Sequence, residues 1–225
     1  MKVVIGQGSC GVATGARKTA AEFEKQIADK NLDINVGITG CVGTCYLEPI
    51  VDIYDDNGEM TRYVKVQPEK VEKIVEEHLV NHKVAEEYAI SDEDKQVVGR
   101  QPRVVLRNCG VINPEDIEEY VAADGYKAIE KVLSSMTPDE VIEEIKISGL
   151  RGRGGAGFPT WFKWNAAKQS PGNEKYLVCN ADEGDPGAFM DRSVLEGDPH
   201  SLLEGMIIGG YAMGANHGVI YCRAE

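Results

Sequence analysis

The chain has 225 residues, of which 42% are hydrophobic and 27% charged, as in ordinary globular proteins. Its formal net charge of -13 argues against nucleic acid as a partner, because an acidic surface repels phosphates. The longest weakly polar stretch, residues 202–215, contains a glutamate and several glycines and is too short to span a bilayer. The start of the chain lacks an export signal, so we expect a cytoplasmic protein without a membrane span.

The first part of the chain predicts a small sheet with helices. Short apolar or alternating runs indicate four strands, at residues 3–5, 34–38, 50–54 and 63–66. Asn57 and Gly58 supply the positive backbone angles of a tight hairpin between the last two strands. A helix is expected over 15–29, and another after Pro68, where apolar residues recur at helical spacing. This order predicts a β-α-β-β-β-α unit over residues 1–82.

The next segment, residues 83–103, is polar, charged and without sustained period, which predicts a linker. A second domain is expected over residues 104–225. Just before the linker, His78 and His82 stand four residues apart at the end of the predicted helix. We expect them to complement the helix dipole and not to bind a metal.

Helices follow in series in the second domain, and one of them leads into a glycine-rich segment. Thr137 is placed to cap this helix, with Pro138 at its first position and Glu140 three residues after the cap. Gly149 is placed to end it. The glycine-rich segment therefore begins directly where this helix ends.

That segment has five glycines between Gly149 and Gly157, with Arg151 and Arg153 between them and Lys163 shortly after. A backbone without Cβ atoms can curl so that several N–H groups converge on an anion, and the cationic side chains add charge. Glycine-rich turns are also common without any ligand. The length and basic content of this segment favour a phosphate-binding loop.

Two long segments carry a resemblance to a known family. They read GLRGRGGAGFPTWFKW, residues 149–164, and KYLVCNADEGDPGAFMDR, residues 175–192. Both resemble the NADH-binding FMN flavoprotein subunits of respiratory complex I and the diaphorase subunits of NAD-linked and electron-bifurcating hydrogenases and formate dehydrogenases. The resemblance covers about residues 104–225 and implies the first part of a Rossmann-like domain that binds FMN and NAD(H).

The resemblance also implies roles for individual residues. Those that match positions around the flavin phosphate and ribityl chain are Gly152, Arg153, Gly154 and Lys163. Those that match positions around the flavin ring are Asn180, Asp182 and Glu183. Phe158 matches an aromatic residue beside the nicotinamide pocket, and Asp185 stands where complex I usually has glutamate. The resemblance implies no catalytic acid or base, because the flavin supplies the hydride chemistry.

The same acidic segment has a physical rationale of its own. Asn180, Asp182, Glu183 and Asp185 follow the apolar run 176–178, so they stand at the carboxyl end of a predicted parallel strand. Ligands of open α/β sheets bind at such ends. Taken alone, the segment favours a solvated acidic turn, whereas its occurrence together with the glycine-rich loop favours a ligand-binding role.

Three of the six cysteines form a set. Cys10 follows the first strand, and Cys41 and Cys45 follow the second, so three thiols are expected at one edge of the small sheet, where thiolates suit an iron-sulfur cluster. The other three stand in apolar or strand-like surroundings and are expected to be buried structural thiols: Cys109, Cys179 and Cys222.

The segments GSCGVATGA and GCVGTCYLEP make this half of the chain similar to the thioredoxin-like [2Fe-2S] domain that accompanies these flavoproteins. The resemblance implies Cys10, Cys41 and Cys45 as ligands and a further cysteine at position 5, where this chain has Ile5. Two alternatives remain open. Either a group such as Ser9 is the fourth ligand, or the domain has lost its cluster and serves for docking.

The fold class expected for the whole is α/β, with a thioredoxin-like ferredoxin domain before the flavoprotein domain. The function implied is an electron-transfer subunit that oxidises NADH, or reduces NAD+, at FMN and exchanges single electrons with iron-sulfur clusters. Partners implied are other iron-sulfur subunits of a soluble hydrogenase- or formate-dehydrogenase-like complex, including a separate thioredoxin-like [2Fe-2S] subunit. A [4Fe-4S] cluster is expected only in a C-terminal part absent here. The alternative is a non-catalytic fragment, or a docking or electron-carrier module that lacks a complete flavin site.

Overall fold

The computed structural model describes residues 1–185 and 187–223. It contains two compact units, the first made of Met1–Ala123 with Ser193–Asp198 and the second of Asp124–Arg192 with Pro199–Glu225. The predicted linker, residues 83–103, lies inside the first unit, so the boundary between the compact units does not coincide with it. The division into domains at that linker stays a prediction about the protein.

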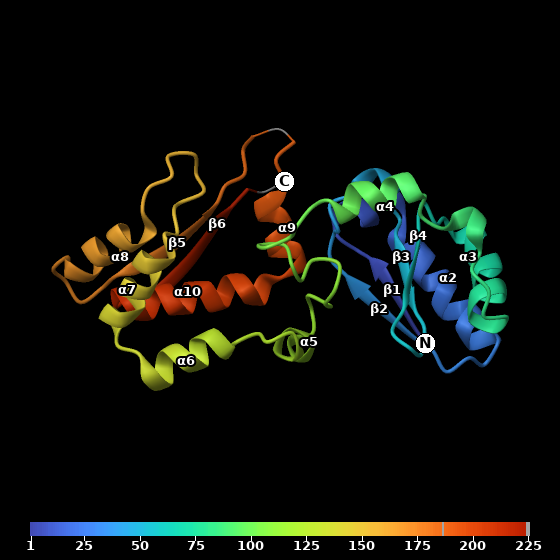
Figure 1. The fold of residues 1–225 in the computed structure, drawn as a ribbon, viewed down its shortest axis with the longest axis horizontal. Coiled ribbons are helices and arrows are strands. Elements are labelled where there is room, and N and C mark those ends of the chain that lie inside the picture. Colours follow the sequence, from blue (N-terminus) through green and yellow to red (C-terminus); the bar gives the residue numbers. More distant parts are fainter. Residues whose placement is uncertain (186, 224–225) are drawn as a thin grey trace. The chain divides into compact units, whose positions relative to one another are not determined.

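The first unit is built on a four-stranded sheet (Figure 1). Its strands are β1 (Lys2–Gly6), β2 (Asn35–Thr39), β3 (Val51–Tyr54) and β4 (Met60–Tyr63), in the spatial order β2-β1-β3-β4. Strand β2 is parallel to β1, whereas β3 is antiparallel to both β1 and β4. With the helices between and after these strands, the predicted β-α-β-β-β-α order is confirmed.

The fourth strand begins three residues earlier than the sequence predicts, at Met60. The carboxylate of Asp55 accepts hydrogen bonds from the N–H groups of Asn57 and Glu59, both at 2.8 Å, and Gly58 has a φ of +84°. These contacts close the hairpin within a few residues, so Tyr54 already pairs with Met60. The predicted hairpin is therefore confirmed with a shorter connection, but the positive angle predicted at Asn57 is wrong, and of the two residues only Gly58 has one.

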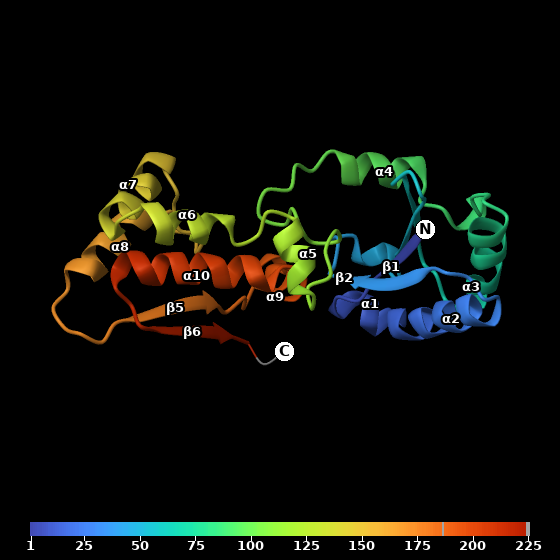
Figure 2. The ribbon, with the colours of Figure 1, turned by 90° about the horizontal axis from the view of Figure 1, so that it is seen from below.

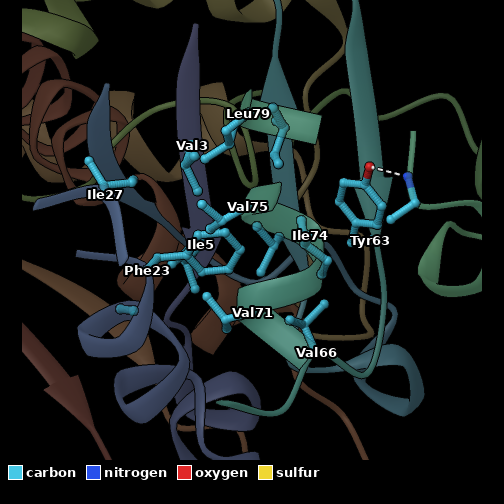
Figure 3. Packing of buried hydrophobic residues seen from close by; sticks show 14 of the residues in the cluster. Val3, Ile5, Phe23, Ile27, Tyr63, Val66, Val71, Ile74, Val75 and Leu79 are labelled. Carbon is cyan, nitrogen blue, oxygen red and sulfur yellow. Dashed lines mark hydrogen bonds between the residues drawn. The ribbon is translucent and has the colours of Figure 1, made fainter. Parts of the chain in front are cut away.

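The core of the first unit lies on one face of this sheet (Figure 3). Helix α1 (Ser9–Thr14) leads into α2 (Ala16–Asp29), and α3 (Pro68–Ile74) continues as a π-helix over Val75–Val80. Fully or almost fully buried side chains from β1, α2, α3 and the π-helix pack together there, among them Val3, Ile5, Phe23, Val71 and Ile74. The helix periodicity seen in the sequence is thus explained by this shared core.

The polar segment after the π-helix is more ordered than its composition suggests. It forms a 3-10 turn at Glu86–Tyr88 and helix α4 (Asp92–Gly99), and α5 (Ile117–Ala122) follows. Ala85 and Ile90 are buried, and Ala89 pairs with Tyr63 at the edge of β4. These two buried apolar side chains help to hold the segment to the sheet. They are too few to give the sequence a helical or strand-like periodicity.

The second unit has a two-stranded parallel sheet covered by helices. Its elements are α6 (Lys127–Ser135), α7 (Pro138–Ser148), α8 (Thr160–Gln169), β5 (Tyr176–Ala181), α10 (Pro199–Met213) and β6 (His217–Cys222). Helix α9 (Met190–Gly197) begins in this unit, and its residues from Ser193 onward are part of the first unit. In Figure 2, α10 lies along the sheet with α6 and α7 on its other side, and α8 lies near one end of α10. A Cβ at Gly209 of α10 would lie 2.9 Å from Leu177 and 3.1 Å from Trp164, so glycine permits this close packing. The β5-α10-β6 arrangement is the β-α-β unit of Rossmann-like sheets.

Helix α7 has the ends that the sequence predicts. The hydroxyl of Thr137 accepts a hydrogen bond from the N–H of Glu140, and the carboxylate of Glu140 accepts one from the N–H of Thr137. Pro138 is its first residue, and Gly149 ends it with a φ of +67°. The expected α/β class is likewise confirmed. Within the residues that the structure describes, no helix is long and apolar enough to cross a membrane.

Candidate functional site

The glycine-rich segment is a hairpin-like loop between α7 and α8. At its base, the N–H of Gly152 donates to the carbonyl of Phe158 at 2.8 Å, and the N–H of Thr160 donates to the carbonyl of Leu150 at 3.1 Å. The guanidinium of Arg151 donates to the carbonyl of Gly157 at 3.0 Å and so holds the two sides together. Arg151 therefore shapes the loop, a role that the sequence did not distinguish from that of Arg153.

The tip of the loop is open. Gly155 and Gly157 have positive φ angles of +97° and +60°, which reverse the chain without strain only at glycine. A Cβ built at Gly154, Gly155 or Gly157 would meet no atom within 4 Å. Among the described residues, the backbone N–H groups of 153–157 have no hydrogen-bond partner. The tip therefore offers free donors and free space, as an anion requires.

Charged and aromatic side chains surround this loop. Arg153 is exposed at the tip, and Lys163 is exposed on α8, the helix that begins where the loop ends. The ring of Phe158 meets that of Phe162 edge to face at 5.7 Å between centroids, and Phe162 meets Trp161 at 5.6 Å. About half of the Phe158 side chain remains exposed. Two exposed cations and a half-exposed aromatic ring thus belong to the loop or to the first turns of the helix that follows it.

The residues after β5 form the second predicted segment. The side-chain oxygen of Asn180 accepts a hydrogen bond from the N–H of Asp182 at 3.0 Å, which turns the chain out of the strand. Both carboxylate oxygens of Glu183 accept from the start of α9, from the N–H groups of Asp191 and Arg192, each at 3.1 Å. Glu183 therefore caps α9, a role that the sequence did not predict. Asp185 is exposed.

The structure thus places the nine predicted flavin and nicotinamide residues in two segments of the same unit. Gly152, Arg153, Gly154 and Phe158 belong to the loop and Lys163 to α8, whereas Asn180, Asp182, Glu183 and Asp185 end β5 or follow it. In the described part of the chain, no hydrogen bond or ion pair joins the two segments. Their joint contact with a flavin stays a prediction.

The three cysteines of the predicted set lie together in the first unit. The sulfur atoms of Cys41 and Cys45 are 3.8 Å apart, and Cys45 shares a further side-chain hydrogen bond with Cys10. The N–H of Gly43 donates to the sulfur of Cys41 at 3.2 Å. A Cβ at Gly8 would lie 2.9 Å from Cys41, so glycine lets the loop of Cys10 approach that of Cys41. Burial raises the pKa of the Cys41 and Cys45 thiols.

The position of the missing cysteine, Ile5, and the alternative ligand, Ser9, both already have contacts in the structure. Ile5 is fully buried and points into the core that α2 and α3 cover. Ser9 is at the start of α1, where both its N–H and its hydroxyl donate to the carboxylate of Glu196. Ile5 is thus part of the apolar core, and Ser9 already has a hydrogen-bond partner.

A buried glutamate beside the thiols was not singled out by the sequence. Glu48 is 6% exposed, and its Oε2 accepts from the N–H of Ile50 at 2.9 Å, whereas its Oε1 has no partner among the described residues. Burial raises the pKa of this carboxyl to about 7, against the lowering effects of the Ile50 N–H and of Arg62. Thr44, 8% exposed, also has a hydroxyl without a partner in this part of the chain.

The remaining cysteines divide into two kinds. Cys109 is buried, its thiol donates to the carbonyl of Ser193 at 3.4 Å, and burial raises its pKa to about 11, as expected for a structural thiol. Cys179 is half-buried, and Cys222, at the end of β6, is exposed. The prediction of burial is therefore wrong for Cys222, because β6 exposes all of its residues.

Comparison with known proteins supports the assignment of the second half. Residues 145–225 match the family model of the Nuo51 FMN-binding domain. The HndC subunit of the NADP-reducing hydrogenase of Solidesulfovibrio fructosivorans is 60% identical over 56% of this chain and 25% of its own length. A subunit of the NADH-quinone oxidoreductase of Escherichia coli is 44% identical over 50% of this chain and 25% of its own length. The chain thus spans about a quarter of these relatives.

The region from residue 145 onward is therefore similar to the Nuo51 FMN-binding domain. More specifically, the chain is similar to flavoprotein-type subunits of a hydrogenase and of an NADH-quinone oxidoreductase, which agrees with the resemblance carried by the two long motifs. Two solved structures are also similar. One is a NAD+-reducing [NiFe]-hydrogenase, 22% identical with a TM-score of 0.43 over 99% of this chain and 37% of that chain. The other is the wild-type thioredoxin-like [2Fe-2S] ferredoxin of Aquifex aeolicus, 27% identical with a TM-score of 0.35 over 40% of this chain and 96% of that chain.

Proposed function

We propose that this chain is part of an electron-transfer flavoprotein subunit that oxidises NADH, or reduces NAD+, at FMN. The observation that carries the proposal is the loop at residues 150–159. It lies within the region matched by the FMN-binding family model, and it presents free N–H groups and open space next to two exposed cations. These are the properties that a phosphate group requires.

The residues of the chain would act by binding and orientation. The N–H groups at the loop tip, with Arg153 and Lys163, would neutralise the phosphate of FMN, and Phe158 would offer its exposed ring to the nicotinamide. FMN supplies the chemistry, because it accepts a hydride and releases single electrons. Asn180 and Asp182 would fix hydroxyl groups of the ligand at the carboxyl end of β5. No side chain of the chain has to transfer a proton.

The electrons would leave through iron-sulfur centres. Cys10, Cys41 and Cys45 fit one such centre, because their sulfurs converge and two of them lie 3.8 Å apart. Two thiolates on one tetrahedral ion with bonds of about 2.3 Å are separated by roughly 3.8 Å. The partners would be the iron-sulfur subunits of a cytoplasmic hydrogenase- or formate-dehydrogenase-like complex, including a separate thioredoxin-like [2Fe-2S] subunit. The high identity to a hydrogenase subunit supports this kind of assembly.

Flavin binding by the chain tests the proposal. FMN fluorescence should be quenched on addition of the protein, and anaerobic addition of NADH should then bleach the absorbance of the bound flavin. The variant Gly154→Ala should bind FMN at least tenfold more weakly, on the order of 1.4 kcal/mol, because its Cβ clashes with no protein atom but enters the space of the phosphate.

Gly205→Ala is the matched control, because a Cβ there also meets no atom within 4 Å and lies on α10, away from the loop. It should bind FMN as the wild type does. Protein that leaves flavin fluorescence and absorbance unchanged would contradict the proposal and favour a docking module instead.

A further inference from the structure

The carboxylate of Glu48 lies close to the backbone that carries two of the cysteines. Glu48 directly follows the 3-10 turn Cys45–Leu47, and its Oε2 would lie 3.1 Å from a Cβ built at Gly11, the residue after Cys10. Its unpartnered Oε1 is buried although a buried polar atom without a partner is costly. Such an atom indicates a ligand that the carboxylate would meet when the site is filled.

The carboxylate also fills the space at the end of β1. A Cβ built at Gly6 would lie 3.3 Å from both oxygens of Glu48, and one built at Gly11 would lie 3.1 Å from Oε2. Gly6 is the last residue of β1, and Gly11 directly follows Cys10 in α1. Side chains alternate between the faces of a strand. Ile5 therefore points into the core, and position 6 faces the Glu48 carboxylate.

The thiols require one more ligand for a two-iron cluster. In the described part of the chain, no three His, Cys, Asp or Glu side chains are arranged to hold a single metal ion. A [2Fe-2S] cluster instead takes two protein ligands at each iron. Cys41 and Cys45 have the spacing for one iron, which leaves Cys10 in need of one partner for the other.

The available oxygen ligands differ in suitability. Ser9 donates both its hydroxyl and its N–H to Glu196. Thr44 has an unpartnered hydroxyl but no negative charge to replace a thiolate. Glu48 combines an unpartnered oxygen, burial and the capacity for a negative charge, and iron accepts carboxylate ligands.

We propose that Glu48 is the fourth protein ligand of the N-terminal iron-sulfur cluster and serves, together with Cys10, the iron that Cys41 and Cys45 do not hold. The inference rests on the cluster of the proposed function, and it gives that cluster a mixed set of three thiolates and one carboxylate. Ligation satisfies the orphaned Oε1, while Oε2 keeps its hydrogen bond from Ile50.

The test is iron and sulfide analysis of the whole chain after anaerobic reconstitution, with EPR of the reduced sample. Wild-type protein should hold the full complement of a [2Fe-2S] cluster. Glu48→Gln should lose most of its iron and sulfide and its EPR signal. This variant keeps the size of the side chain and an oxygen for the Ile50 N–H, so its circular dichroism and thermal melting should show a folded protein.

Four further variants make the result specific. Ser9→Ala and Thr44→Val should keep the cluster, and so should Glu59→Gln, which changes an exposed glutamate of the hairpin. The double variant Gly6→Cys with Glu48→Ala removes the carboxylate and puts a thiol in the space beside it. It should regain the cluster with a shifted EPR spectrum, because four thiolates then surround the irons.

The outcomes separate this inference from the proposed function. Retention of the wild-type iron content and EPR spectrum in Glu48→Gln would overturn the role of Glu48 while leaving the cluster in place. Loss of the cluster in Ser9→Ala or Thr44→Val, with retention in Glu48→Gln, would move the ligand to that hydroxyl. Wild-type protein without any iron or sulfide would overturn the cluster itself and the role of Glu48 with it.

Discussion

The hydroxyl of Tyr63 is at the centre of a buried hydrogen-bonded chain. It accepts from the N–H of Ala85 at 3.1 Å, drawn as a dashed line in Figure 3, and lies 2.7 Å from Nδ1 of His78. Burial raises the pKa of Tyr63 to about 12, so the hydroxyl keeps its proton and donates a hydrogen bond to Nδ1 of His78. His78 is therefore held as the neutral imidazole. The predicted role of His78 as a cation at the end of the helix is wrong, because the side chain is buried.

Because the neutral form of His78 is buried, we expect the protein to be less stable in acid. Burial lowers the pKa of His78, against a small opposite effect of Asp55, so the unfolded chain takes up the proton at a higher pH than the folded protein. The free energy of unfolding should therefore fall as the pH drops below about 6.5, the ordinary value for histidine. His78→Asn keeps an acceptor for Tyr63 but does not titrate. Urea unfolding between pH 7 and 5 should show a smaller loss of stability for this variant.

His82→Asn is the control, because His82 is exposed and has a φ of +52°, which asparagine tolerates. Its loss of stability between pH 7 and 5 should stay close to that of the wild type, because His82 is the smallest of the three causes that set the pKa of His78. Glu48, with its raised pKa, contributes the opposite slope in this range, since the folded protein binds its proton more tightly. The contribution of Glu48 is the same in the wild type, His78→Asn and His82→Asn. The difference in pH dependence between His78→Asn and the other two proteins therefore measures the contribution of His78. Identical slopes for wild type and His78→Asn would contradict the prediction.

At the scale of elements, one ion pair joins the middle of the first sheet to its edge. Asp52 of β3 is directly opposite Arg62 of β4, and the guanidinium donates to both carboxylate oxygens at 2.7 and 2.6 Å. The two side chains are 2% and 11% exposed, and they lie on the face opposite to the main core. Both charged groups are shielded from water on this face, and each provides the counter-charge and hydrogen bonds that the other needs.

Breaking this pair from one side should be costly. Arg62→Met leaves Asp52 buried without a counter-charge, so the free energy of unfolding should fall by about 3–5 kcal/mol. The double variant Arg62→Met with Asp52→Leu should recover most of that loss. Lys146→Met, which breaks the exposed pair with Glu143, should cost less than about 1 kcal/mol. Equal losses for the buried and the exposed pair in urea titrations would contradict this account.

Local features of the sequence predicted the elements well and the contacts between distant elements less well. The cap at Thr137, the stop at Gly149 and the hairpin at Gly58 depend on a few neighbouring residues, and the structure has all three. Glu48 was not singled out, because its burial depends on the approach of β1 and α1, some forty residues away in the chain. Likewise, Glu183 caps a helix that begins after an intervening turn. The sequence shows that Glu48 and Glu183 are acidic, but it does not show which groups they contact.

At the scale of the whole molecule, the two sets of candidate ligands share no residue. The thiols and Glu48 belong to the first compact unit, and the glycine-rich loop with the end of β5 belongs to the second. Each unit also has its own buried cluster of apolar side chains, one around Phe23 and one around Val141. Substitutions that lie in separate cores and share no partner usually have additive effects.

The loss of one group should therefore leave the other in place. Glu48→Gln should lose iron and sulfide and still quench FMN fluorescence as the wild type does, whereas Gly154→Ala should bind FMN poorly and retain its iron. Their combination should show both losses and no further decrease in thermal stability beyond the sum of the two. Parallel iron analysis, flavin titration and melting of the four proteins measure this directly. A loss of FMN binding in the folded, iron-depleted Glu48→Gln variant would instead show that the cluster region supports the flavin loop, and the two units would then have to be treated as one cooperative structure.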